Sequence, residues 1–194
     1  FSNFSKKLIK PILTSAWPIA ISAMIGSLTI NTDILIIGLY RTAQEVGFYS
    51  AAQRPIQLLY ILPSILATSI FPALSRIARD QKEKSGPILE KMLSIAFMGA
   101  LPLTVGGVIL APYIILMFFG QSYTQSTIPF QILIFTMLTN FPATILANTL
   151  FAFDRQRVLI YFAIIAGLTN AIIDFLLIPS LGIAGAAIVT LFAQ

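Results

Sequence analysis

Long apolar runs dominate the chain, and short polar, glycine-containing or proline-containing breaks separate them. These runs predict membrane helices over 12–39, 46–77, 86–118, 127–153, 157–178 and 183–194. An α-helix needs about 20 apolar residues to cross the hydrocarbon core of a bilayer, and the longer runs reach that length. The pattern therefore predicts an all-α, polytopic transmembrane bundle of about six spans, a single unit over 1–194 without a sizeable soluble domain.

The composition fits a protein whose solvent is the bilayer. Hydrophobic residues make up 57% of the chain and charged residues only 10%, whereas soluble domains carry about 25% charged residues. The chain has no cysteine and no histidine, which excludes thiolate chemistry and histidine-containing metal sites or triads within it. We therefore expect neither enzyme activity nor a cofactor.

Basic residues are distributed unevenly between the two sides of the predicted bundle. Ten of the 12 Lys and Arg residues lie on one side: Lys6, Lys7, Lys10, Arg76, Arg79, Lys82, Lys84, Lys91, Arg155 and Arg157. The opposite side carries only Arg41. By the positive-inside rule the ten mark the cytoplasm, so we expect a cytoplasmic N-terminus. Because topology also explains the net charge of +5, no nucleic-acid partner is expected.

Three ionisable residues remain at membrane depth: Asp33, Arg54 and Asp174. Each costs about 2.5 to 3.5 kcal/mol there and needs a partner or a water-filled cavity. Asp33 and Arg54 flank a predicted hairpin turn near residue 43 at similar distances, which predicts an ion pair. Either the pair locks the hairpin, or Arg54 binds an anionic substrate while Asp33 orients it or exchanges a proton. For Asp174, near the non-cytoplasmic end of its helix, an interfacial, solvated carboxylate is the favoured interpretation.

Polar side chains gather on one face of several predicted helices. Helical periodicity places these residues of 46–77 in one stripe: Ser50, Gln53, Arg54, Gln57, Tyr60, Ser64 and Thr68. Four-residue spacing does the same for Asn140, Thr144 and Asn148, and for Asn170 and Asp174. Small and polar residues also align in 12–39, where close packing is the better explanation, and interhelical hydrogen bonds explain any single group. Together, however, the polar faces predict walls around a hydrated volume.

Several short motifs occur in an order that resembles a transporter family. They are Asn31 with Asp33-Ile-Leu-Ile-Ile-Gly38, Val46-Gly47-Phe48-Tyr49-Ser50-Ala51-Ala52-Gln53, Leu62-Pro63, Phe71-Pro72-Ala73-Leu74-Ser75-Arg76, Phe119-Gly120-Gln121-Ser122-Tyr123, and Asn170-x-x-x-Asp174 with Gly182-Ile183-Ala184-Gly185-Ala186-Ala187. Together they resemble the second half of polysaccharide flippases of the MOP superfamily, which also includes multidrug and toxin extruders and lipid II flippases. The resemblance implies two six-helix lobes that rock around a central cavity. The chain, which starts at Phe1, is then expected to be a fragment that supplies most of one lobe.

A short internal repeat agrees with a transporter. Asp33-x-Leu-Ile-Ile leads into a helix start that contains Gly47, and Asp174-x-Leu-Leu-Ile leads into one that contains Gly185. Repeated helical units are common in transporters.

These observations lead to the hypothesis of a flippase for polyprenyl-pyrophosphate-linked oligosaccharides. It would act in the bacterial inner membrane during O-antigen-like polysaccharide assembly, among membrane lipids and beside a possible polysaccharide polymerase. Arg54 is expected to hold pyrophosphate or acidic sugars, because a partly desolvated guanidinium binds phosphate bidentately. The expected cavity residues beside it are Gln53, Gln57, Tyr60, Asn140 and Asn148. Asp33 and Asp174 are candidates for ion coupling or a salt bridge.

Other functions remain open at this point. In a cation-coupled drug extruder Asp33 would bind a proton or sodium, although the membrane-embedded Arg54 argues against cationic drugs. A lipid II flippase is a third transporter hypothesis. A membrane glycosyltransferase should show a carboxylate cluster in a large loop, but the longest hydrophilic segment, 76–91, is basic and interfacial. A helical scaffold subunit is a further alternative outside transport.

Overall fold

The computed structural model describes residues 16–17, 20–21, 24, 31–80 and 85–193. Residues 31–40 are helical and precede α2 (Ala43–Leu59), α3 (Ile61–Asp80), α4 (Ser85–Phe119), the 3₁₀-helix η3 (Gln121–Ser126), α5 (Thr127–Leu133), α6 (Thr136–Ala152) and α7 (Arg157–Ala193). The described residues contain no β-strand, and the protein is an all-α bundle. Most of the predicted span 12–39 lies outside the described residues.

Long apolar helices make this a multi-pass membrane protein. Among the described residues, three helical segments are long and apolar enough to cross a bilayer, and a fourth arises if α5 and α6, bent by 45° at their junction, count as one broken span. This count is below six because 12–39 is largely outside the described part and α7 counts once although it folds back on itself. Large apolar side chains cover the outside; Met98, Tyr113 and Phe192 are 72%, 70% and 82% exposed. Such a surface is suited to lipid.

A capping box fixes the start of α2. The Glu45 backbone N–H donates to the Thr42 hydroxyl oxygen at 3.3 Å, and the Thr42 N–H donates to the Glu45 carboxylate at 3.2 Å. The helix therefore begins at Ala43, three residues before the predicted start at residue 46.

The predicted helix 46–77 is broken at Tyr60 into α2 and α3. Pro63 accounts for the break, because it has no N–H to donate to the Leu59 carbonyl and its ring crowds that oxygen. The Ser64 hydroxyl donates to the Tyr60 carbonyl at 3.0 Å. On the other side, the Tyr60 hydroxyl lies 2.9 Å from that of Thr136, the first residue of α6. The break in α2–α3 thus meets the break in α5–α6.

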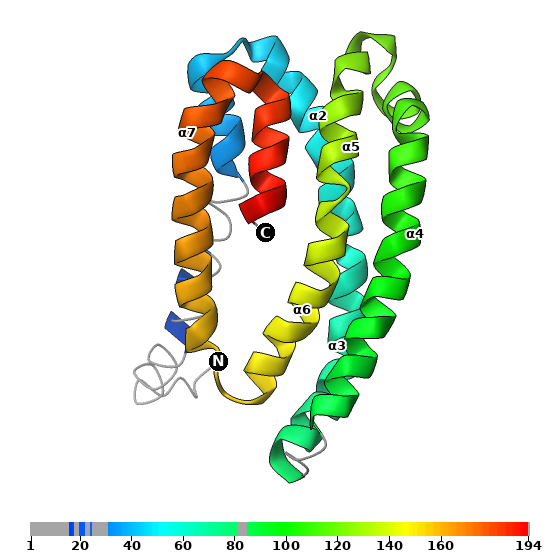
Figure 1. Cartoon of the computed structure of the whole chain (residues 1–194), viewed down its shortest axis with the longest axis vertical. Helices are drawn as coiled ribbons and strands as arrows, with labels where there is room; N and C mark the ends of the chain where they lie inside the picture. The colour runs from blue at the N-terminus through cyan, green and yellow to red at the C-terminus, as the bar shows by residue number, and fades with distance from the viewer. Residues whose placement is uncertain (1–15, 18–19, 22–23, 25–30, 81–84, 194) are drawn as a thin grey trace, which may run out of the picture.

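The predicted helices 157–178 and 183–194 form one bent element, α7. The bend is at Gly182, whose φ of 62° and ψ of −146° suit glycine and disfavour residues with a Cβ. Figure 1 shows one arm of α7 rising and the other descending beside it. α7 is therefore a helical hairpin.

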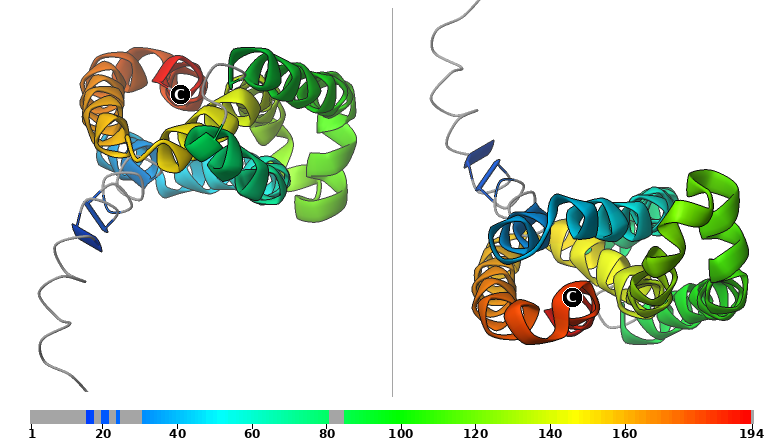
Figure 2. Two further views of the ribbon diagram at one scale, coloured as in Figure 1. Left: turned by 90° about the horizontal axis from the view of Figure 1, so that it is seen from below. Right: turned by 90° about the horizontal axis from the view of Figure 1, so that it is seen from above.

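The helices are arranged around two central ones. α3 and α4 pack on α6, and α2 and α7 pack on α5; α7 and α4 lie on opposite sides of the bundle (Figure 2). The end of α3, the start of α4 and the α6–α7 link lie at one end of the bundle, and the bend of α7 lies at the other (Figure 1). The described basic residues of these segments therefore gather at one end: Arg76, Arg79, Lys91, Arg155 and Arg157.

Gly107 of α4 marks a tight contact in the core. A Cβ added there would lie 2.5 Å from Cγ1 of Ile134, which is fully buried at the α5–α6 junction, whereas a Cβ at Gly106 meets nothing within 4 Å. We expect Gly107→Ala to cost about 1 to 3 kcal/mol through overpacking, and Gly106→Ala to be neutral or stabilising because Ala favours helix. Apparent melting temperatures of the full-length protein measure both. Equal values for the two variants would contradict the contact.

Candidate functional site

A buried polar cluster surrounds Asp33, which is only 1% exposed. Its Oδ2 accepts hydrogen bonds from the hydroxyls of Tyr49 at 2.6 Å and Thr190 at 2.5 Å. The carboxyl group of Asp174, which is 0% exposed, interacts with that of Asp33. The helix 31–40, α2 and both arms of α7 therefore converge on one carboxylate.

The first helical hairpin brings Asp33 and Tyr49 to the same level. The chain turns at Arg41, and these two residues lie eight positions before and eight positions after it. With a rise of 1.5 Å per residue, both lie about 12 Å from the turn.

The bend of α7 brings Asp174 and Thr190 to the same level in the same way. These residues lie eight positions before and after Gly182. In a straight helix they would be about 24 Å apart and could not both reach Asp33. The cluster therefore depends on the glycine bend.

Several buried oxygens of the cluster have no hydrogen-bond donor. Among the described residues they are Oδ1 of Asp33, Oδ1 and Oδ2 of Asp174, and Oδ1 of Asn170. Asn170 is 1% exposed and lies one helical turn before Asp174 on the same face of α7. Buried carboxylates without donors are costly, so this arrangement calls for a shared proton or a bound cation. Oxygen-only ligands suit a hard cation.

Two predictions about membrane-embedded charges are wrong. Asp33 forms no ion pair with Arg54: Asp33 is buried against Tyr49, whereas Arg54 is exposed on α2. The hairpin turns at Arg41, so the residue level with Asp33 is Tyr49, and Arg54 lies five residues further, about 7.5 Å along the helix. Asp174 is not a solvated interfacial carboxylate, because it is 0% exposed.

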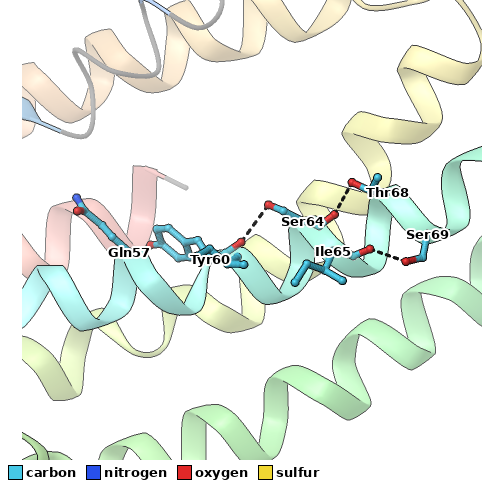
Figure 3. A pocket seen from close by; sticks show the side chains of 7 residues that line it. Gln57, Tyr60, Ser64, Ile65, Thr68 and Ser69 are labelled. Atoms are coloured by element: carbon cyan, nitrogen blue, oxygen red, sulfur yellow. Dashed lines mark hydrogen bonds between the residues drawn. The ribbon is translucent and has the colours of Figure 1, made fainter.

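An open groove follows the predicted stripe across the α2–α3 junction. Its volume is about 490 Å³, and most of its lining surface is apolar. The lining residues are the polar Gln57, Tyr60, Ser64, Thr68 and Ser69 and the apolar Ile61 and Ile65. Figure 3 shows Gln57, Ser64 and Thr68 on the same side of the two helices. Ser64 and Thr68 are exposed, although each hydroxyl donates to a carbonyl one turn earlier. The lower part of the stripe is therefore an accessible polar surface.

The upper part of the stripe divides into a buried and an exposed residue. Gln53 is 7% exposed and has an interaction partner within the protein, so it does not line the groove. Arg54 is exposed and lies three residues before Gln57. Only Arg54 of this pair is available to a ligand from outside the bundle.

Asn140 and Asn148 belong to a polar ladder on α6. The Thr144 hydroxyl donates to the Asn140 carbonyl at 2.7 Å, and the Asn148 amide donates to the Thr144 carbonyl at 2.9 Å. Both asparagines are partly exposed. One turn before Asn140 on α6, the hydroxyl of Thr136 lies 2.9 Å from that of Tyr60. Tyr60 of the groove therefore contacts the helix that carries the ladder.

The hydrophobic pattern does not mark Tyr49 and Thr190 as partners of Asp33. A tyrosine and a threonine in apolar helices are ordinary residues, and neither breaks the hydrophobic pattern. Their signal is the internal repeat: Tyr49 lies sixteen residues after Asp33, and Thr190 lies sixteen residues after Asp174.

Comparison with known proteins gives one family and three relatives. The model of a family described as polysaccharide biosynthesis protein matches residues 2–128. The chain is 30% identical over 166 residues to the probable flippase AglR of Haloferax volcanii. These 166 residues are 84% of this chain and 35% of the relative. It is 24% identical over 159 residues to the probable low-salt glycan biosynthesis flippase Agl15 of the same organism. This alignment covers 81% of this chain and 34% of the relative.

The third relative is the capsular polysaccharide biosynthesis protein CapF of Staphylococcus aureus. It is 24% identical over 198 residues, which cover 100% of this chain and 48% of the relative. The chain thus spans about a third to a half of the length of these relatives. No solved structure matches it significantly. Because the family match extends over more than half of the 194 residues, the chain belongs to the polysaccharide biosynthesis protein family.

Proposed function

We propose that the chain forms part of a transporter that flips lipid-linked oligosaccharides across a membrane for polysaccharide assembly. The groove on α2–α3 carries the proposal, because its row of polar residues interrupts an otherwise apolar surface. Lipid tails cannot hydrogen-bond its side chains, whereas water and sugar hydroxyls can. Gln57 and Tyr60 in the groove, and Asn140 and Asn148 on α6, are the proposed partners of the sugar.

Arg54 supplies the charge that a lipid carrier with a diphosphate would need. Its side chain is exposed and unpaired with Asp33, so its donors are available to an anion. A guanidinium binds two phosphate oxygens at once, and binding strengthens as water is excluded. The proposed substrate is therefore a polyprenyl-pyrophosphate-linked oligosaccharide whose lipid tail stays in the bilayer.

The Asp33–Asp174 pair is the proposed ion-coupling site. Asp33 Oδ2 already receives two hydroxyl donors, which stabilises a negative charge there. Asp174 and Asn170 add oxygens that lack donors. One proton or one sodium ion shared by the two carboxyl groups would remove one of their two negative charges, and its release would alter how the two hairpins pack.

The uneven distribution of basic residues supports a proposed orientation in the membrane. The basic end of the bundle is proposed to face the cytoplasm, in the plasma membrane or inner membrane of the cell. The names of two relatives mention a low-salt glycan and a capsular polysaccharide. The proposed polysaccharide is therefore a surface glycan in general, and an O-antigen-like polymer is the narrower proposal. A polysaccharide polymerase is the proposed protein partner.

Loss of the full-length protein tests this function in the source cell. A missing flippase should leave complete oligosaccharides on the lipid carrier, protected from a glycosidase added outside the cell. A missing glycosyltransferase should instead leave truncated oligosaccharides. Surface polysaccharide of normal amount and length would contradict the proposal.

A cation-coupled drug extruder is the second candidate, because the buried Asp33–Asp174 pair suits ion coupling with any substrate. In the same deletion strain, increased sensitivity to cationic dyes with unchanged surface polysaccharide would favour it.

A further inference from the structure

Arg41 joins the ends of the two hairpins that build the Asp33 cluster. It lies at the turn between the helix 31–40 and α2, and its side chain reaches α7. Its Nε donates to the Ile178 carbonyl at 3.2 Å, and its Nη2 donates to the carbonyls of Ile178 at 3.1 Å and Pro179 at 2.9 Å. One guanidinium thus fastens the first hairpin to the second.

These carbonyls need an external donor because α7 bends directly after them. The last four carbonyls before a helix break lack the usual partner four residues ahead, and a cation is favourable at such an end. The bend is in close contact with the arginine. A Cβ on Gly182 would be 3.5 Å from Arg41 Nη2 and 3.7 Å from Glu45 Oε1. Arg41 therefore holds the point where α7 reverses.

We infer that Arg41 is a positioning residue for the ion-coupling site proposed above. Asp33 and Tyr49 are eight residues from Arg41, and Asp174 and Thr190 are eight residues from Gly182. Each hairpin arm is helical over that distance, so a displacement at the ends is transmitted to the cluster about 12 Å away.

The contacts at Asp33 depend on the alignment that Arg41 sets. The hydroxyls of Tyr49 and Thr190 come from different hairpins and meet on one oxygen, with 3.2 Å between them. Sliding one hairpin against the other would separate Thr190 from Asp33 and leave a further buried acceptor without a donor. Arg41 touches neither the carboxylates nor the groove residues, so its effect on the ion must pass through this alignment.

The test is the stabilisation that the bound ion gives to the full-length protein. A ligand that binds only the folded state raises the apparent melting temperature with its concentration. The purified protein is titrated with sodium chloride, with choline chloride keeping the ionic strength constant, and separately with pH. Arg41→Ala should need about ten times more sodium or protons for the same rise, as for other residues that orient ion ligands. Arg41→Lys should recover only part, because one ammonium cannot replace the planar guanidinium at both carbonyls.

Arg157→Ala is the matched control, since it removes an exposed arginine at the opposite end of the same α7 arm. The melting temperature of Arg157→Ala should rise over the same range of sodium concentration and pH as that of wild type. If Arg41→Ala lowers the melting temperature without shifting the ion concentration at which that temperature begins to rise, Arg41 only stabilises the hairpins and the inference is overturned. If wild type responds to neither ion, the ion site itself fails, and Arg41 loses this role while glycan flipping is still tested separately by the deletion strain.

Discussion

Asp33→Asn should reduce the affinity for the coupling ion about 100-fold and abolish ion-driven transport. The change removes the negative charge that two hydroxyls stabilise while keeping the size of the side chain. A lost charged interaction of about 3 kcal/mol corresponds to that factor. Asp174→Asn should have a similar effect. The double variant should be little worse than either single one, because both residues serve one ion.

Stability distinguishes an ion site from a structural carboxylate pair. Without a coupling ion the two buried carboxyl groups oppose each other, so Asp33→Asn should leave the melting temperature in sodium-free buffer at high pH unchanged or raised. It should also lose the ion-dependent rise. Asp154→Asn is the control: Asp154 is exposed, and its φ of 57° suits asparagine as well as aspartate. An Asp33→Asn protein that keeps the full ion-dependent rise would refute the site.

Arg54→Ala should lower the flipping rate of a pyrophosphate-linked oligosaccharide about 10- to 100-fold, the loss expected for one charge-assisted phosphate contact. Its melting temperature should stay near that of wild type, because the side chain is exposed. Arg54→Lys should be intermediate, since lysine keeps the charge but not the bidentate geometry. Lys91→Ala, an exposed cation on α4, should flip normally. A normal rate in Arg54→Ala would remove the substrate role.

Much of the helical architecture could be predicted from the hydrophobic pattern, because apolar runs in this chain are long and their breaks are marked. The range 86–118 is an example: α4 runs from Ser85 to Phe119. The break at Tyr60 could not be placed in the same way, since several prolines lie inside these helices and only some of them interrupt one. Pro102 and Pro112, for instance, both lie within the continuous α4.

The candidate site was predictable as single residues but not as a cluster. A charge in an apolar run is conspicuous, so Asp33, Arg54 and Asp174 could be selected. Their partners depend on where each hairpin turns, and an error of two residues at the first turn replaced Tyr49 by Arg54 as the predicted neighbour of Asp33. Helical periodicity likewise groups the stripe residues without showing which of them a neighbouring helix covers.

Flipping by the reconstituted full-length protein tests the central claim most directly. Vesicles would contain a fluorescent oligosaccharide on a polyprenyl pyrophosphate, and a membrane-impermeant quencher would report which leaflet holds it. Wild type should move the glycan between leaflets faster than protein-free vesicles do, in response to a sodium or proton gradient. Asp33→Asn should lack the response to the gradient, and Arg54→Ala should flip about 10- to 100-fold more slowly than wild type. Exchange no faster than in protein-free vesicles, or equal in wild type and both variants, would contradict a glycan flippase that works through these residues.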